Sequence, residues 1–265
     1  MGKAEKGKKP VSAKPVKTNR GSSVLSKELT AKKFIERLKI YQSDEELEKL
    51  KRYFKLGKGD YGYGDKFIGV KMGNLFALAK EFAEMPIKEI EKLLESPIHE
   101  IRAGAVSIMD KASRNKKISE ERVKDFFELY MRRHDRINNW DLCDLGCLNM
   151  TGSYLYDKPH DLLYKLARSK NIWERRTAIL STCYFIRQGD TTDTFKIAEI
   201  LVNDNEDLIH KATGWMLRFA GAKDQKKLIA FLNKHAATMP RTLLRYSIEH
   251  FNKKERDYYL SKYKS

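Results

Sequence analysis

The sequence predicts an all-α fold made of repeated helix pairs, and three observations support this prediction. First, apolar residues recur at helical spacing almost continuously from about Ser26 to the C-terminus. Second, we find no convincing stretch with the alternation of apolar and polar residues that is typical of strands. Third, a basic residue followed three positions later by a small one recurs at a regular interval, which indicates an internal repeat.

The first 22 residues differ in composition from the rest of the chain. They are rich in Lys, Gly, Pro and Ser, and residues 1–20 hold seven Lys and Arg against the single acid Glu5. Such a segment has almost nothing to bury. We therefore expect residues 1–22 to be a disordered basic tail and residues 23–265 to form a single repeat domain. The tail either aids solubility or loosely holds phosphates, and both interpretations stay open.

The helices of the repeat domain are expected in the following order. Leu29, Phe34 and Leu38 lie on one face of a first helix, and Ser43 opens a capping-box pattern at the start of a second. The glycine-rich stretch 57–64 is expected to be a loop. Its glycines lack the order of a phosphate-binding loop, which excludes an NTP site of that kind. Further helices are expected at about residues 67–83, 87–95, 98–115, 119–134, 139–156, 160–170, 172–188, 192–203, 206–221, 224–237 and 240–263, the last broken near Asn252.

The internal repeat sets the expected architecture. It is carried by three pairs of a basic and a small residue, Arg102 with Ala105, Arg175 with Ala178, and Lys211 with Gly214. The second and third pairs are 36 residues apart, and the first and second are 73 apart, so a middle copy is expected near residues 138–141. A period of this length with two helices per unit is typical of HEAT-like repeats. We therefore expect a right-handed superhelical solenoid of HEAT-like helical repeats with a long concave surface.

The charge balance indicates a polyanionic partner. The chain has 53 Lys and Arg against 36 Asp and Glu, a formal net charge of +17. The tail residues 1–20 account for +6, so the folded body carries +11 of its own. This excess favours nucleic acid, or less often an anionic membrane surface, as the partner.

The cysteines and the lack of targeting segments indicate a reducing, intracellular location. Cys143, Cys147 and Cys183 are too few and too unevenly spaced for a disulfide framework. A zinc site would need further ligands at matched spacing, and none is evident in the sequence. We therefore expect the three thiols to be buried among apolar residues. The N-terminus has no apolar run of a secretory signal, and no stretch approaches the length of a membrane span.

Three segments occupy corresponding places in successive repeats and form a candidate site. They are 139–144 (NWDLCD), 173–176 (WERR) and 214–218 (GWMLR). Trp140 and Asp144 are four residues apart, so they share a helix face. Taken singly, a Trp in a helix lies more often in the core than at a ligand site. An Asp in a helix usually points to solvent or caps a neighbouring turn, and an Arg on a basic helix is mostly solvated. Their common repeat phase favours one surface that carries two indoles, a carboxylate and several guanidiniums.

These segments carry a family resemblance. INNWDLCDL, IWERRTAIL and HKATGWMLR, together with RYFKLGKGDYGYGDKFIGVKM near the N-terminus, resemble the AlkD-like branch of the DNA alkylation repair glycosylases. The resemblance runs from about Leu29 to the C-terminus. It implies HEAT-like repeats wrapped around duplex DNA and base excision repair of positively charged N-alkylated purines, of the 3-methyladenine and 7-methylguanine type. It implies no metal and no organic cofactor.

The resemblance also implies roles for individual residues. It makes Asp144 the catalytic carboxylate, placed to stabilise the positive charge that develops on the deoxyribose. It makes Trp140 and Trp215 the indoles that flank the sugar and backbone of the lesion, and Arg176 the residue that completes the site. It implies further DNA contacts by Arg218, to a phosphate, and by Tyr53.

The expected partner is double-stranded DNA that contains alkylated bases. We expect a monomer that acts in the cytoplasm in association with the nucleoid. The main alternative is a HEAT-like protein that binds DNA structures without excising a base, because a fold does not fix a function. A protein-interaction scaffold is a third interpretation, which predicts an apolar or mixed concave face and no salt-dependent binding to random duplex DNA.

Overall fold

The computed structural model describes residues 28–263 and is all-α, which confirms the expected fold class. Within these residues there is no β-strand, only two isolated bridges, Gln42 with Val70 and Lys66 with Ile98. The expected basic tail, residues 1–22, lies outside the described part of the chain. No helix in the described part combines the length and apolar character needed to cross a bilayer.

The helices follow one another with short connections. They are α1 (Ala31–Lys39), α2 (Asp44–Tyr53), α3 (Met72–Glu81), α4 (Ile87–Leu94), α5 (His99–Ser113), α6 (Glu120–Arg132), the 3₁₀ turn η1 (His134–Arg136), α7 (Trp140–Gly146), the π turn η2 (Cys147–Thr151), α8 (Gly152–Leu155), α9 (Asp161–Ala167), α10 (Ile172–Arg187), α11 (Thr192–Leu201), α12 (Asp207–Lys223), α13 (Gln225–His235), α14 (Arg241–Ser247) and α15 (Lys253–Lys262).

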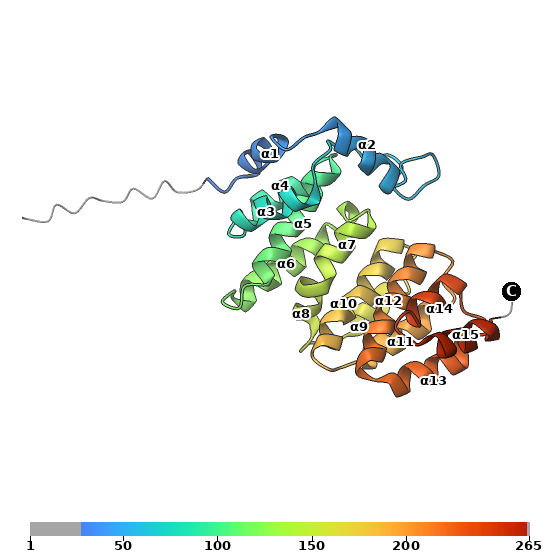
Figure 1. Cartoon of the computed structure of the whole chain (residues 1–265). Coiled ribbons are helices and arrows are strands. Elements are labelled where there is room, and N and C mark those ends of the chain that lie inside the picture. The colour runs from blue at the N-terminus through green and yellow to red at the C-terminus, as the bar shows by residue number, and fades with distance from the viewer. Residues whose placement is uncertain (1–27, 264–265) are drawn as a thin grey trace, which may run out of the picture.

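The helices form a two-row solenoid (Figure 1). In the inner row, α3, α5, α7, α10, α12 and α14 each contact the next. The outer helices α4, α6, α9, α11 and α13 pack behind this row. Helices α5 and α10 are buried on nearly every side, as expected for the middle of such an array. The array bends into an arc, with α2 and its following loop at one end and α12 to α15 at the other (Figure 1).

The repeat is present, but its third copy is displaced by one residue from the expected position. Arg102 Nη1 donates to the Ser96 carbonyl at 3.0 Å, and Arg175 Nη1 donates to the Ser169 carbonyl at 2.9 Å, in each case six residues back. In the third copy His210 Nε2 makes the same contact, with the Asp204 carbonyl at 2.5 Å. These side chains therefore brace the loop before each inner helix, which leaves Lys211 free of this role.

The helix expected at 67–83 begins later, at Met72. The backbone N–H groups of Ile68, Gly69 and Val70 all donate to the buried carboxylate of Glu100, at 2.9 to 3.3 Å. Gly69 has a φ of 76°, which interrupts a helix, and the curled backbone around it lets three successive N–H groups reach one carboxylate. This segment ties the N-terminal part of the chain to α5.

The helix expected at 139–156 contains a π turn. Helices α7 and α8 are joined without a break by the turn Cys147–Thr151, in which Thr151 Oγ1 donates to the Gly146 carbonyl at 2.9 Å. Turns of this kind are frequent beside functional sites. The π turn begins three residues after Asp144.

Two local predictions at helix starts are confirmed. Ser43 is the N-cap of α2, where its hydroxyl accepts the Glu46 N–H at 3.4 Å. The break near Asn252 is also present: α14 ends at Ser247, and Asn252 begins α15 with a reciprocal capping box with Glu255. The three cysteines are buried and not joined in disulfides, as expected.

Candidate functional site

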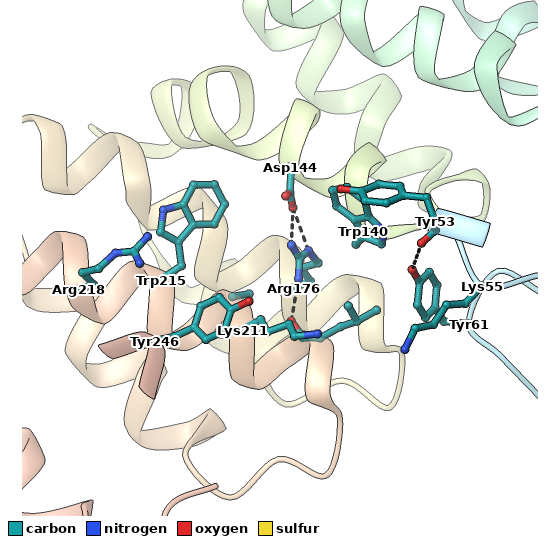
Figure 2. Close-up of a pocket in the computed structure, with 12 residues that line it drawn as sticks. Tyr53, Lys55, Tyr61, Trp140, Asp144, Arg176, Lys211, Trp215, Arg218 and Tyr246 are labelled. Carbon is teal, nitrogen blue, oxygen red and sulfur yellow. Dashed lines mark hydrogen bonds and ion pairs between the residues drawn. The ribbon is translucent and has the colours of Figure 1, made fainter. Parts of the chain in front are cut away.

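A cavity of about 380 Å³ opens on the inner row of helices and draws residues from both ends of the chain. All six residues singled out from the sequence line it, namely Tyr53, Trp140, Asp144, Arg176, Trp215 and Arg218. They come from α2, α7, α10 and α12, and Figure 2 shows Asp144 between the two indoles with Arg176 beside it. The structure therefore brings the six side chains together, and their roles stay predictions.

Asp144 and Arg176 form an ion pair at the floor of the cavity. Arg176 Nε and Nη2 both donate to Asp144 Oδ1, at 2.9 and 2.7 Å, and Nη1 donates to the Leu208 carbonyl at 2.7 Å. The guanidinium is thus fixed between α7 and α12. Oδ2 of Asp144 accepts no hydrogen bond from residues 28–263, so one carboxylate oxygen is held and the other is available.

The surroundings of Asp144 act on its ionisation in opposite directions. Burial raises the pKa of the carboxyl, Arg176 lowers it, and the nearby charge of Asp141 raises it again, with a net increase above the ordinary value of 3.8. The side chain is 21% exposed. A partly buried carboxylate that is paired on one oxygen only can interact strongly with a cation that enters the cavity.

Trp140 forms one wall of the cavity and is supported from behind. Its indole stacks on the buried ring of Phe54 with a centroid distance of 5.6 Å and an interplanar angle of 17°. The exposed ring of Tyr53 meets it edge-on at 5.7 Å. Because Tyr53 and Phe54 end α2, the N-terminal part of the chain determines where this indole lies.

Trp215 forms the opposite wall. It lies one position after Gly214 on α12 and packs edge-on against Phe219 at 5.6 Å. At Gly214 an added Cβ would lie 2.5 Å from Tyr246 Cβ and 2.7 Å from the Leu243 carbonyl oxygen. The glycine is therefore what allows α14 to approach α12 and to bring Tyr246 into the cavity wall.

Part of the segment 173–176 lies elsewhere than the sequence suggested. Trp173 is buried in the core, and Arg175 pairs with Asp204 at 2.6 Å in the outer loops. Only Arg176 of this segment lines the cavity. The two neighbouring arginines of α10 point to different sides because successive helix residues are rotated by about 100°.

Six lining residues were not identified as site residues from the sequence, namely Lys55, Tyr61, Leu208, Lys211, Ala212 and Tyr246. Lys55 follows the end of α2 with a φ of 50°, a left-handed position where Gly is more usual. The only signal in the sequence for Lys55 as a site residue is its place in the segment RYFKLGKGDYGYGDKFIGVKM, which carries part of the family resemblance. Lys211 was expected only as a repeat residue; Asp207 raises its pKa, which keeps it cationic.

A second hollow, of about 610 Å³, continues from this cavity along α12 and α14. It shares Lys211, Arg218 and Tyr246 with the first and adds Arg245 and Arg256. The carboxylate of Glu249 on its edge pairs with Arg218. The two hollows together form a groove with more cationic than anionic side chains.

No group of His, Cys, Asp and Glu within the described residues is arranged to hold a metal ion. The side chains that line the cavity supply a carboxylate, two indoles, tyrosine hydroxyls and cationic groups.

Comparisons with known proteins bear on the family and the fold of this chain. The family model of the DNA alkylation repair enzymes matches residues 34–251. A solved structure from Enterococcus faecalis, described as a predicted DNA alkylation repair enzyme, is similar with a TM-score of 0.61 and 19% identity over 80% of this chain and 97% of that one. At this identity the likeness concerns the fold. A search of curated proteins finds no match.

Proposed function

The chain belongs to the DNA alkylation repair enzyme family, and from this premise we propose that it is a DNA glycosylase. The proposed reaction releases positively charged N-alkylated purines, of the 3-methyladenine and 7-methylguanine type, from duplex DNA. We further propose that the enzyme acts as a monomer on chromosomal DNA in the cytoplasm and needs no cofactor.

The chemistry of the lesion suits the cavity. An N-alkylated purine carries a positive charge, so when the C1′–N bond breaks the base takes both electrons and leaves neutral. Positive charge moves to C1′ and the ring oxygen of the deoxyribose. Water then adds to C1′ and loses a proton, which completes hydrolysis. The protein has only to stabilise the sugar cation and to place the water.

The observation that carries the proposal is the geometry of Asp144. Arg176 holds one carboxylate oxygen, and the other has no partner among residues 28–263. This arrangement leaves one fixed acceptor for a sugar cation or for the attacking water. A carboxylate needed only for structure would be expected to use both oxygens within the protein.

The indoles would flank the same sugar. Trp140 and Trp215 stand on either side of Asp144 (Figure 2). An indole face attracts cationic and polarised C–H groups by about 0.5–2 kcal/mol. The faces would therefore favour the cationic sugar over the neutral one, and their bulk would limit the access of bulk water.

The cations of the groove would hold phosphates without reading sequence. Lys55, Lys211 and Arg218 line the cavity on different sides of Asp144. Contacts of this kind fix the register of a duplex and leave base identity unread. In this proposal selectivity comes from the charge of the lesion rather than from contacts to base edges.

The test is base release. Duplex DNA treated with a methylating agent is incubated with the protein, and freed 3-methyladenine and 7-methylguanine are measured by mass spectrometry. Release by the wild-type protein that is strongly reduced in Asp144→Asn supports the proposal. Salt-dependent binding without release would instead indicate a DNA-binding protein that lacks excision activity. Asp157→Asn, which changes an exposed surface carboxylate, is the control.

A further inference from the structure

A buried polar cluster lies directly behind the Trp140 wall. It consists of Asp65 in the loop before α3, His99 at the start of α5 and Asp141 in the first turn of α7. His99 Nδ1 is 3.2 Å from Asp65 Oδ2, and Nε2 is 2.8 Å from Asp141 Oδ2. The side chains are 1%, 6% and 8% exposed for His99, Asp65 and Asp141. An imidazole with a carboxylate on each nitrogen donates twice, which only its cationic form can do.

The cluster is attached to the start of α7. Asp65 also accepts hydrogen bonds from Arg102 Nη2 at 2.6 Å and from Asn139 Nδ2 at 3.3 Å. Asn139 is the N-cap of α7, and its side-chain oxygen accepts the Trp140 N–H at 2.8 Å. The backbone of Trp140 is therefore fixed through Asn139 to Asp65.

A chain of aromatic contacts leads from the same histidine to the indole. The His99 ring stacks on Phe67 at 4.6 Å and contacts Phe54 at 4.9 Å. Phe54 in turn stacks on Trp140. His99 thus reaches Trp140 by a polar route through its backbone and an aromatic route through its ring. None of the three cluster residues lines the cavity, so none of them meets DNA there.

Stability alone does not account for a cluster of this kind. The desolvation of buried ions offsets much of their attraction, and well-packed apolar residues are often as stable. A cluster that joins three separate elements instead specifies how they sit relative to each other. The elements joined here are the loop between α2 and α3, helix α5, and helix α7 with Trp140 and Asp144.

We propose that Asp65, His99 and Asp141 are positioning residues that fix the Trp140 indole beside Asp144, and that they affect base release without touching DNA. The part that concerns base release rests on the proposed glycosylase function. The part that concerns the indole does not.

The cluster gives the proposal a signature in pH. Burial lowers the pKa of His99, but the charges of Asp141 and Asp65 outweigh burial and raise it to about 9. The charged groups facing the imidazole are Asp65 and Asp141, and Arg102 reaches it through Asp65. Above the pKa the ring loses one of its two N–H groups, so one carboxylate is released. The position of Trp140 should change on the alkaline side and stay constant near neutrality.

The test follows the indole itself. The protein is labelled with 5-fluorotryptophan, and its three fluorine resonances are assigned with single Trp→Phe variants. We expect His99→Gln to shift or broaden the Trp140 resonance and to leave that of Trp173 in place. In the wild type the Trp140 resonance should move with a midpoint near pH 9. The control is His160→Gln, which breaks a second His–Asp pair, 2.7 Å long, with Asp193 away from the cavity.

The kinetic readout separates positioning from a merely structural role. We expect His99→Gln to lower the single-turnover rate of base release about 10- to 100-fold and to leave the Kd for DNA nearly unchanged, because small displacements at a reacting centre have effects of this size. If Trp140 moves when His99 loses its proton, the wild-type rate should decline at alkaline pH. This decline should be absent in the variant. His160→Gln should leave both the rate and its pH profile as in the wild type.

The outcomes are distinguishable. An unchanged Trp140 resonance in folded His99→Gln protein, or no movement of this resonance with pH in the wild type, would overturn the proposal. If His99→Gln does not fold, Asp65→Asn, which keeps the shape of the cluster, replaces it in the fluorine and kinetic measurements. If the wild type releases no base, the glycosylase function fails, and the fluorine resonances still decide whether the cluster positions Trp140.

Discussion

Replacement of Asp144 by Asn keeps the shape of the side chain and removes its charge. A unit carboxylate about 4 Å from a unit cation in surroundings of effective dielectric constant about 20 gains about 4 kcal/mol. A sugar cation that is half developed in the transition state gains about 2 kcal/mol. At about 1.4 kcal/mol per tenfold in rate, these values predict a loss of about 30- to 1000-fold.

The same change should not weaken DNA binding. The carboxylate lies beside Arg176 in a groove that would receive phosphates, so its removal frees positive charge. We expect a Kd equal to that of the wild type or a few-fold tighter at low salt. The Asn side-chain oxygen can still accept from Arg176, so the loss in unfolding free energy should stay near 1–2 kcal/mol.

The assay is single-turnover release of 7-methylguanine with enzyme in excess, alongside Kd from fluorescence anisotropy and Tm from calorimetry. The split between a large loss in rate and an unchanged Kd is the expected result. An equal loss in both would show that Asp144 is a structural or DNA-binding residue, and an unchanged rate would remove it from the mechanism.

Three further predictions follow from the same geometry. Because Asp144 must be ionised and its pKa is raised, the rate of base release should fall as pH falls through a midpoint above 3.8, and Asp144→Asn should lack this decline in its residual rate. Glu249→Gln removes the carboxylate that pairs with Arg218. DNA affinity should therefore rise about 3- to 10-fold at low salt, and the slope of log affinity against log salt concentration should steepen by about one. Unchanged affinity would exclude Glu249 as a competitor of phosphate. Gly214→Ala should lower the unfolding free energy by about 1–3 kcal/mol, because the added Cβ would overlap α14. The control is Gly73→Ala, which has open space at its Cβ and should be neutral or slightly stabilising. Chemical denaturation measures both.

Much of the fold follows from information local in the sequence. Helical periodicity and capping residues such as Ser43 and Asn252 depend on neighbours within a few positions, and both predicted helix starts are present. The non-helical segment 68–70 could not be predicted in this way. Its partner Glu100 lies about 30 residues further on, and only the tertiary fold brings the two together.

The six residues singled out from the sequence all line the cavity, but their contacts and the other lining residues could not be predicted. Trp140 and Asp144 are four residues apart on one helix, so their common face follows from the helical period. The family resemblance assigned Arg176 rather than Arg175 to the site, but its partners Asp144 and the Leu208 carbonyl lie on other helices and could not be predicted. Lys55 and Tyr246 come from opposite ends of the chain and meet the site only because the solenoid bends.

The central claim is that the free oxygen of Asp144 faces the sugar on which positive charge develops. Duplex DNA with a pyrrolidine in place of the damaged nucleoside carries a cation at that sugar, and a tetrahydrofuran site is its neutral counterpart. The wild type should bind the cationic duplex more tightly than the neutral one. Asp144→Asn should lower this preference about 30- to 1000-fold, matching its loss in rate, and should keep only the smaller preference that the two indoles provide. Equal binding of the two duplexes by the wild type would contradict the account.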